Sequence, residues 1–213
     1  MIFAVLPVKA PQNAKQRLAE VLPADARERL ARILFEHAFA ALSAARGIDR
    51  IVVVTSDLET ANHAYRMGAW ILEEREQHSH NKSADHAAFW AKEQGADTVA
   101  LVPIDVPLVR PADFEVLVAG ALRPGVGIVP SADGAGTNAL VRSPPDVIES
   151  RFGTNSFEAH LSQARERGVS VSVLRPPGLV FDLDGPEDVP QLLARAPHCR
   201  AAQFLRSQCT FRS

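Results

Sequence analysis

Short runs of apolar, largely β-branched residues alternate along this chain with longer segments that have helical periodicity. The apolar runs include residues 2–8, 51–55 and 98–102, which contain few polar positions. Such runs are typical of strands buried on both faces, as in parallel sheets whose crossover helices cover both sides. The pattern therefore predicts an α/β fold with a mostly parallel sheet and helices on both faces.

The remaining periodicity predicts the other elements. Helices are expected over residues 24–45, 59–67, 82–94, 111–122, 156–167 and 186–195, and further strands over 69–72, 126–130, 138–142, 169–174 and 180–183. Residues 124–180 have more strand and turn character, which predicts a small antiparallel portion on the same sheet. We expect one domain over residues 1–197, because no linker or repeat interrupts them, and a loosely held C-terminal tail over residues 198–213.

Composition argues against several classes of partner and location. Hydrophobic residues make up 46% of the 213 residues and charged residues 23%, an ordinary balance for a globular domain. The formal net charge of −2 argues against a nucleic-acid partner. No apolar run approaches the roughly 20 residues that span a membrane, and the first residues lack signal-peptide features. The two cysteines, Cys199 and Cys209, show no metal-binding spacing, and we expect a cytoplasmic protein.

Charged side chains follow several of the predicted strands. In open parallel sheets, ligands bind beyond the carboxyl ends of the strands. Carboxylate oxygens are preferred ligands of Mg²⁺, and lysine and arginine neutralise phosphate charge. Both kinds of group are needed to handle a nucleoside triphosphate with Mg²⁺. The candidates at this edge are Lys9, Lys15, Arg17, Asp57, Asp105, Asp182 and Asp184.

These candidates also have purely structural interpretations. The cations after the first strand could form a solvated basic loop, and Asp57 suits the N-cap of the helix that follows it. The run DGPE at 184–187 fits a capping box with Asp184 at the N-cap and Glu187 at N3. Asp105, in LVPIDVPLV, suits the start of an Asx turn, whereas Asp182 has no local capping role.

Two loops have the composition of anion-binding turns. SADGAGTNAL (131–140) contains two glycines, a hydroxyl and an amide, which lets backbone N–H groups approach an anion, although an ordinary hairpin turn has the same composition. RFGTNSFEAH (151–160) places a glycine turn before a helix start, with Asn155 or Ser156 as N-cap. Ser156 and His160 share one helix face, but a Ser–His nucleophilic pair there lacks an evident third orienting group.

Five stretches carry a more specific signal: LPVKAPQNAKQRLA, IDVPLV, DGAGTNAL, RFGTNSFEAH and FDLDGPEDV. Together they resemble the motifs of the 2-phospho-L-lactate guanylyltransferase family, from residue 1 to about residue 193. The resemblance implies a Rossmann-like nucleotidyltransferase domain that transfers GMP from GTP to a phosphorylated three-carbon acid and releases pyrophosphate. The acid would be 2-phospho-L-lactate, phosphoenolpyruvate or 3-phospho-D-glycerate, and the product would pass to the next enzyme of coenzyme F-420 biosynthesis.

The resemblance also implies roles for individual residues. The residues that would hold Mg²⁺ are Asp105, Asp182 and Asp184. Those that would bind the GTP phosphates and take part in catalysis are Lys9, Lys15 and Arg17, and Asp105 would also be catalytic. The acid substrate would be bound by Thr137, Asn138, Gly153, Ser156 and His160, and the nucleotide, near its base and ribose, by Asn81.

Two places depart from the family pattern. Pro103 and Ile104 replace a small strand-end residue and the glycine before the aspartate, and His80 and Lys82 replace a glycine and a leucine beside Asn81. The alternatives that stay open are a nucleotidyltransferase for a molybdopterin cofactor or a sugar phosphate, a glycosyltransferase with a late D-x-D metal motif, and a nucleotide-binding module that has lost catalysis. The sequence leaves the acid and the oligomeric state open.

Overall fold

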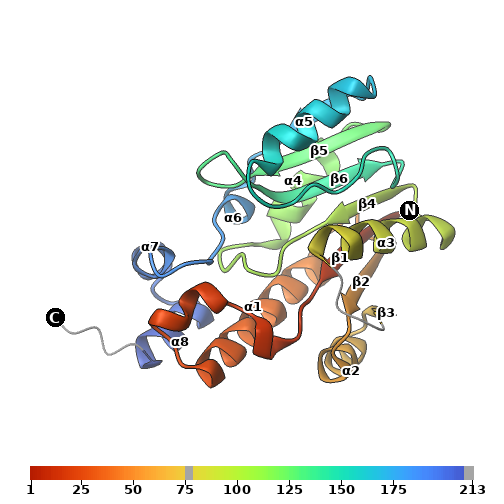
Figure 1. The fold of residues 1–213 in the computed structure, drawn as a ribbon. Helices are drawn as coiled ribbons and strands as arrows, with labels where there is room; N and C mark the ends of the chain where they lie inside the picture. Colours follow the sequence, from red (N-terminus) through yellow and green to blue (C-terminus); the bar gives the residue numbers. More distant parts are fainter. Residues whose placement is uncertain (75–78, 209–213) are drawn as a thin grey trace.

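A seven-stranded sheet forms the centre of the computed structural model, which describes residues 1–74 and 79–208 (Figure 1). Its strand order is β3-β2-β1-β4-β6-β5-β7. The strands are β1 (Ile2–Pro7), β2 (Arg50–Thr55), β3 (Trp70–Glu73), β4 (Thr98–Leu101), β5 (Gly125–Pro130), β6 (Thr137–Ser143) and β7 (Val171–Val173). The helices are α1 (Ala24–Ala44), α2 (Leu58–Arg66), α3 (His80–Glu93), α4 (Pro111–Gly120), α5 (Ser156–Glu166), α6 (Pro177–Val180), α7 (Asp188–Arg195) and α8 (Arg200–Gln208), with two short 3₁₀ helices after β1, η1 (Pro11–Asn13) and η2 (Gln16–Glu20).

The strand directions confirm the predicted mixed sheet. β1 pairs in parallel with β2 and β4, and β2 pairs in parallel with β3. β6 runs antiparallel to both β4 and β5, whereas β7 is parallel to β5. Because β6 runs against β4, its first residues lie at the same edge of the sheet as the carboxyl ends of β1 and β4. The reversal therefore brings the loop before β6 to the ligand edge.

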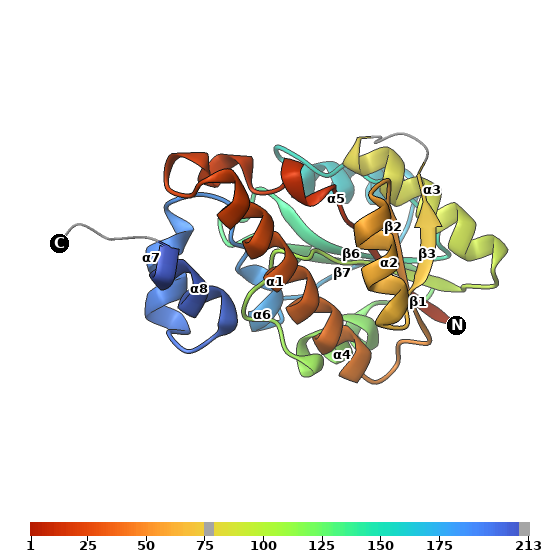
Figure 2. The ribbon, with the colours of Figure 1, turned by 90° about the horizontal axis from the view of Figure 1, so that it is seen from below.

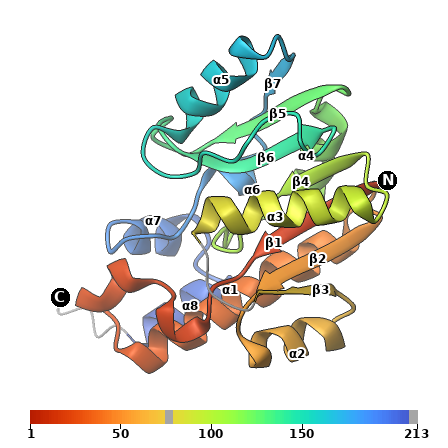
Figure 3. The same cartoon turned by 45° about the vertical axis from the view of Figure 1, so that its right-hand side comes forward.

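Helices cover both faces of the sheet, as apolar strands require (Figure 3). Along β1, Ala4 and Leu6 pack in a cluster with α1, α2, α4 and α6, whereas Phe3 and Val5 pack in a second cluster with α3 and α5. This alternation is the period of two that a strand imposes. A slip of one residue would exchange the two faces, so the packing fixes the register of the sheet.

Residues 200–208 form a packed helix, which corrects the prediction of a loosely held tail for this part of residues 198–213. Residues 209–213 lie outside the described residues. α8 lies beside α1 and α7 (Figure 1 and Figure 2). Its side chains Ala201, Ala202, Phe204 and Leu205 are buried in a third apolar cluster, together with Leu30 of α1. This helix was not predicted because its periodic pattern extends over only nine residues, with arginines and glutamines between the apolar positions.

The strand predicted over 180–183 is also wrong. α6 ends at Val180, and the following residues lie outside the sheet. The side-chain amide of Asn138 donates to the carbonyl oxygens of Leu179 and Val180, at 2.9 and 3.0 Å. The Asn138 side chain thus takes the place that the N–H groups of a neighbouring strand would have as hydrogen-bond donors to this segment.

Two expectations drawn from composition are addressed by the described residues. Across this part of the chain, no helix combines the length and apolarity needed to cross a membrane. Cys199 is a free thiol, and Cys209 lies outside the described residues.

Leu205 tests whether α8 belongs to the folded domain. Its side chain is fully buried, so Leu205→Ala is expected to lower the free energy of unfolding by about 2–4 kcal/mol, measured by equilibrium unfolding in urea. Arg206→Ala, on the exposed side of the same helix, is the matched control and should change it by less than about 0.5 kcal/mol. Equally small effects of both substitutions would show that α8 contributes nothing to stability.

Candidate active site

A cavity of about 480 Å³ opens at the sheet edge where β1 and β4 end. Segments far apart in the sequence form its wall: the loop after β1, the turn after β4, the start of β6 and the segment after α6. The predicted site residues that line it are Lys9, Lys15, Arg17, Asp105, Thr137, Asn138, Asp182 and Asp184. The expectation that cations and carboxylates from different strand ends meet at one edge is therefore confirmed, except for Asp57.

The Lys15 ammonium lies between two carboxylates. Its Nζ is 3.0 Å from Asp105 Oδ2 and 3.2 Å from Asp184 Oδ1, and its side chain is only 8% exposed. Burial alone would lower the pKa of Lys15, but the two carboxylates raise that pKa above its ordinary value, so the group is charged at neutral pH. The Lys15 backbone is left-handed, with a φ of 52°, which a non-glycine residue adopts only at a cost in energy.

Three carboxylates gather against this single buried ammonium. Burial, together with the charges of Asp105 and Asp184, raises the pKa of Asp182 to about 6. Burial and the charge of Asp105 also raise the pKa of Asp184. At Asp105, burial would raise the pKa, but Lys15 outweighs it and holds that pKa below its ordinary value. The cluster therefore has more carboxylate charge than its one buried cation balances.

The turn after β4 explains Pro103 and the position of Asp105. β4 ends at Leu101, and the N–H of Val102 still donates to the carbonyl oxygen of Val5 in β1 at 3.0 Å. Pro103 comes after this bond, so its missing N–H takes no hydrogen bond from the sheet. The N–H of Leu183 donates to the carbonyl oxygen of Asp105 at 2.9 Å. This bond ties the C-terminal segment to the turn and brings its two aspartates beside Asp105.

Two further cations reach the cavity from the loop after β1. Arg17 is exposed, with Nη2 3.1 Å from Glu187 Oε1 and Nη1 3.9 Å from Asp184 Oδ2. Lys9 is exposed and makes no ion pair with any other residue of the described chain. Both side chains are accessible to an anionic ligand, in contrast to Lys15.

Metal binding at the aspartates stays a prediction. Among residues 1–74 and 79–208, no group of three or more His, Cys, Asp or Glu side chains is arranged to hold a metal ion. Asp105 and Asp184 instead contact Lys15. The oxygen donors are nevertheless of the kind that Mg²⁺ takes.

Asp57 and Asp184, each with two interpretations from sequence, have different roles. Asp57 caps α2, since its Oδ2 accepts from the N–H of Thr60 at 2.8 Å, and it does not line the cavity. Asp184 does not cap α7. Its side chain contacts Lys15, and its backbone N–H donates to Asp188 Oδ2. The predicted capping box is therefore wrong, and α7 begins only at Asp188.

Thr137 and Asn138 hold the side of the cavity formed by β6. Both line it, and the Asn138 amide that binds α6 also lies 3.3 Å from Asp182 Oδ1. Asn138 thereby fixes Asp182, a contact that spacing in the sequence could not indicate.

Gly153, Ser156 and His160, the other residues assigned to the acid, do not line the cavity. Gly153, with a φ of 124°, forms the turn before α5, and its carbonyl accepts from the N–H of Ser156 at 3.1 Å. His160 is fully buried, which corrects the expectation that it contacts substrate directly. Its ring nitrogens contact the Thr137 hydroxyl and the Arg151 N–H, and the ring also interacts with the Ser156 backbone. Neither nitrogen is hydrogen-bonded to the Ser156 hydroxyl, so the Ser–His pair is not formed.

Asn81 is engaged with Phe152. Its Oδ1 accepts from the N–H of Phe152 at 2.7 Å, its Nδ2 donates to the carbonyl oxygen of Phe152 at 3.1 Å, and it does not line the cavity. The neighbouring His80 does line it, with its ring edge-on to Phe152 at 4.8 Å between centroids. Desolvation lowers the pKa of His80 against the opposing charge of Asp105. The only signal for His80 in the sequence was its departure from the family pattern.

A family model described as "Guanylyl transferase CofC like" matches residues 2–211 of this chain. The chain belongs to the CofC-like guanylyl transferase family. It is 39% identical over 195 residues to a phosphoenolpyruvate guanylyltransferase of Sphaerobacter thermophilus, covering 92% of this chain and 94% of that relative. It is 36% identical over 204 residues to a 2-phospho-L-lactate guanylyltransferase of Methanothermobacter thermautotrophicus, covering 95% of this chain and 89% of that relative.

The fold of this CofC-like chain also occurs in a more distant protein. A crystal structure described as a nucleotide-diphospho-sugar transferase from Desulfovibrio desulfuricans matches with a TM-score of 0.78 at 17% identity, covering 97% of this chain and 94% of that one. At this identity, the likeness shows the fold alone. The predicted Rossmann-like nucleotidyltransferase fold is confirmed.

Asp182 gives the protein a pH dependence of defined sign. Its pKa rises from an ordinary 3.8 to about 6, so between these pH values the folded chain binds more protons than the unfolded chain and its stability falls as pH rises. Asp182→Asn removes the carboxylate whose ionisation lowers the free energy of unfolding. In the presence of a chelator, the substitution is expected to raise the free energy of unfolding by roughly 1–2 kcal/mol near pH 7 and by almost nothing near pH 4, measured by thermal unfolding.

Asp146 is the matched control, because Lys92 lowers its pKa. Asp146→Asn should therefore lose stability near neutral pH, the opposite sign. A gain for Asp182→Asn that is larger in acid than at neutral pH would contradict the assignment.

Proposed function

We propose that this chain transfers GMP from GTP to a phosphorylated three-carbon acid and releases pyrophosphate. The observation that carries the proposal is the cavity that joins Lys9, Lys15, Asp105, Asp182 and Asp184 in a chain of the CofC-like guanylyl transferase family. Relatives at 39% and 36% identity are named for phosphoenolpyruvate and 2-phospho-L-lactate. These acids are the first candidates, with 3-phospho-D-glycerate as the third, and coenzyme F-420 biosynthesis is the proposed pathway.

The loop after β1 is proposed to hold the triphosphate. Lys9 and Arg17 are exposed at the cavity, where they can reach phosphate oxygens. The Lys15 ammonium has three N–H donors, of which Asp105 and Asp184 take two, so one is left for a phosphate oxygen. Positive charge at these positions stabilises the negative charge that pyrophosphate gains as it leaves.

Mg²⁺ is proposed to bind at the aspartates. Asp105, Asp182 and Asp184 supply hard oxygen donors, and only one buried ammonium balances their charge. Asp105 and Asp184 each contact Lys15 through a single oxygen, and the second oxygen of Asp184 lies 3.9 Å from Arg17 Nη1. A metal ion would take these second oxygens, with Arg17 turning to the phosphates. When bound, the ion would neutralise charge on the phosphates.

The acid substrate supplies the nucleophile. An oxygen of its phosphate attacks the α-phosphorus of GTP in line, and the bond from that phosphorus to the leaving pyrophosphate oxygen breaks. Because the second pKa of a phosphate is about 6, the attacking group is already ionised at neutral pH. The reaction therefore needs neither a strong base nor a covalent intermediate, and the residues act by positioning and by neutralising charge.

Pyrophosphate release tests this function. The purified chain is incubated with Mg²⁺, each of the four nucleoside triphosphates and each of the three acids. Release is expected with GTP and at least one acid, because the family and its named relatives are guanylyl transferases. No release in any combination would refute the transfer reaction. Release with CTP but not with GTP would refute the base assignment alone.

Asp105→Asn tests the carboxylate that faces Lys15. The substitution keeps the shape of the side chain but removes its charge, so the variant is expected to fold while kcat/KM falls by roughly a hundredfold or more. Circular dichroism and pyrophosphate release are the measurements. Asp146→Asn, a carboxylate that pairs with Lys92 and does not line the cavity, should keep activity within about twofold of the parent chain. Full activity per folded molecule of Asp105→Asn would assign Asp105 a structural role only.

A further inference from the structure

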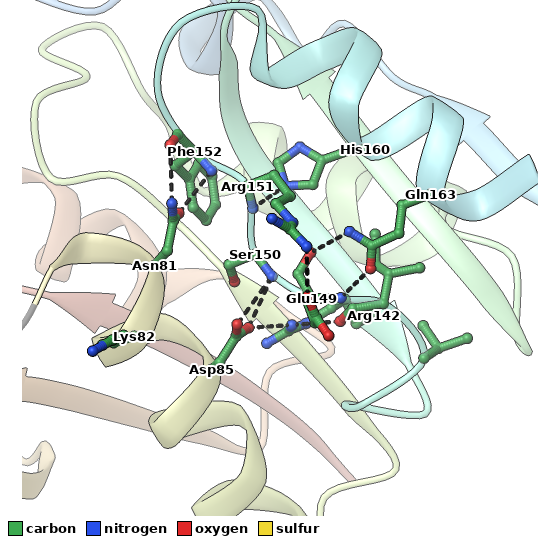
Figure 4. A network of polar contacts seen from close by, with 12 residues as sticks. Asn81, Lys82, Asp85, Arg142, Glu149, Ser150, Arg151, Phe152, His160 and Gln163 are labelled. Carbon is green, nitrogen blue, oxygen red and sulfur yellow. Dashed lines mark hydrogen bonds and ion pairs between the residues drawn. The ribbon is translucent and has the colours of Figure 1, made fainter. Parts of the chain in front are cut away.

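Side chains, rather than a neighbouring strand, hold the segment that leads into the Gly153 turn. Residues 149–152 lie outside every strand, between α3 and α5 (Figure 4). Each of their backbone N–H groups donates to a side chain from one of these two helices. The pairs are Glu149 with Gln163, Ser150 with Asp85, Arg151 with His160, and Phe152 with Asn81. The buried Arg142 in turn holds Asp85 at 2.7 Å.

The contact with Arg151 decides which nitrogen of His160 carries the proton. His160 Nε2 accepts from the Arg151 N–H at 2.9 Å, so Nε2 carries no proton. A neutral imidazole has one N–H, which must then lie on Nδ1. Burial and the charge of Arg142 lower the pKa of His160 to about 4, so the ring is neutral at physiological pH. A charged ring would also set an Nε2–H against the Arg151 N–H.

The Nδ1–H of His160 in turn decides what the Thr137 hydroxyl can do. Nδ1 lies 3.1 Å from Thr137 Oγ1, and because Nδ1 carries the proton, the hydroxyl can only accept from it. The Ser156 backbone is a second partner of the ring, which does not change this role of the hydroxyl. A threonine hydroxyl otherwise rotates freely between donor and acceptor roles. Here its hydrogen cannot point at His160, and Thr137 lines the cavity. The hydroxyl hydrogen is therefore left for another acceptor, such as a ligand oxygen in the cavity.

We propose that His160 is a positioning residue, which fixes the Thr137 hydroxyl as a hydrogen-bond donor for an anionic oxygen of the acid substrate. The proposal rests on the proposed function for the identity of that substrate. Phosphate and carboxylate oxygens accept hydrogen bonds and donate none, so a hydroxyl turned the other way would repel them. His160 acts through Thr137 and never touches the substrate, which agrees with its complete burial.

Steady-state kinetics with phosphoenolpyruvate and GTP test this coupling. His160→Phe and Thr137→Val each remove the oriented donor, and each is expected to raise the KM for phosphoenolpyruvate by about tenfold or more, with the KM for GTP changed by less than about twofold. The double variant should be no worse than the poorer single variant, because both changes remove the same interaction. Effects that multiply in the double variant, or an equal rise in the KM for GTP, would overturn the proposal.

Two further substitutions separate positioning from simple support. In His160→Asn the side-chain amide lies near the place of Nδ1 and can still donate to Thr137, whereas in His160→Gln it reaches toward the place of Nε2. The Asn variant is expected to bind phosphoenolpyruvate better than the Gln variant. Gln163→Leu also removes a side-chain bond to the 149–152 segment but does not touch Thr137, so it should lower Tm and leave both KM values unchanged. The reverse ranking, or a raised KM for phosphoenolpyruvate in Gln163→Leu, would overturn the proposal.

The tautomer can be measured without any turnover. In the full chain labelled with ¹⁵N-histidine, the resonance that is lost in His160→Phe identifies His160 among the seven histidines. We expect long-range ¹H–¹⁵N correlations to show a proton on Nδ1 and none on Nε2 at neutral pH. The opposite tautomer would overturn the proposal even in an active enzyme. Absence of turnover with every acid would instead refute the proposed function and leave the tautomer measurement unaffected.

Discussion

The ion pairs of Lys15 connect three parts of the chain that lie far apart in the sequence. The ammonium contacts Asp105 at 3.0 Å and Asp184 at 3.2 Å, across sequence separations of 90 and 169 residues. A nearly buried charge is tolerated only with well-placed partners, because its desolvation is costly. The carboxylates in turn need the ammonium, since burial raises the pKa of Asp184 even in its presence. The loop after β1, the turn after β4 and the C-terminal segment thus meet at one buried ammonium.

The sequence predicted the sheet and its ligand edge because both follow from local patterns. Apolar runs mark strands buried on two faces, and the parallel direction of β1 and β4 brings Lys15 and Asp105 to one edge. The C-terminal region was harder to predict. At Asp184, the local pattern DGPE outweighed a distant lysine. Residues 180–183 were interpreted as a strand, although the Asn138 side chain binds the carbonyl oxygens of Leu179 and Val180.

The residues around α3 and α5 show a different limit. The family resemblance placed Asn81 and His160 at the substrates, but the structure places both against the backbone of residues 149–152. Their partners are backbone N–H groups, which every residue except proline has, so the partners leave no signature in the sequence. A motif can therefore identify a residue near the site without telling whether it contacts the ligand or holds the residue that does.

The third apolar cluster ties the site to the last described helix. Leu18, shortly after Lys15, and Leu183, just before Asp184, are both fully buried in it together with Leu205 of α8. A chain that emerges from the ribosome N-terminus first presents α8 only after every other described element has been made. The apolar packing beneath the contact of Lys15 with Asp184 is therefore complete only after α8 has been made. A nascent chain that stops before α8 contains all the strands of the sheet but lacks the support that fixes its site.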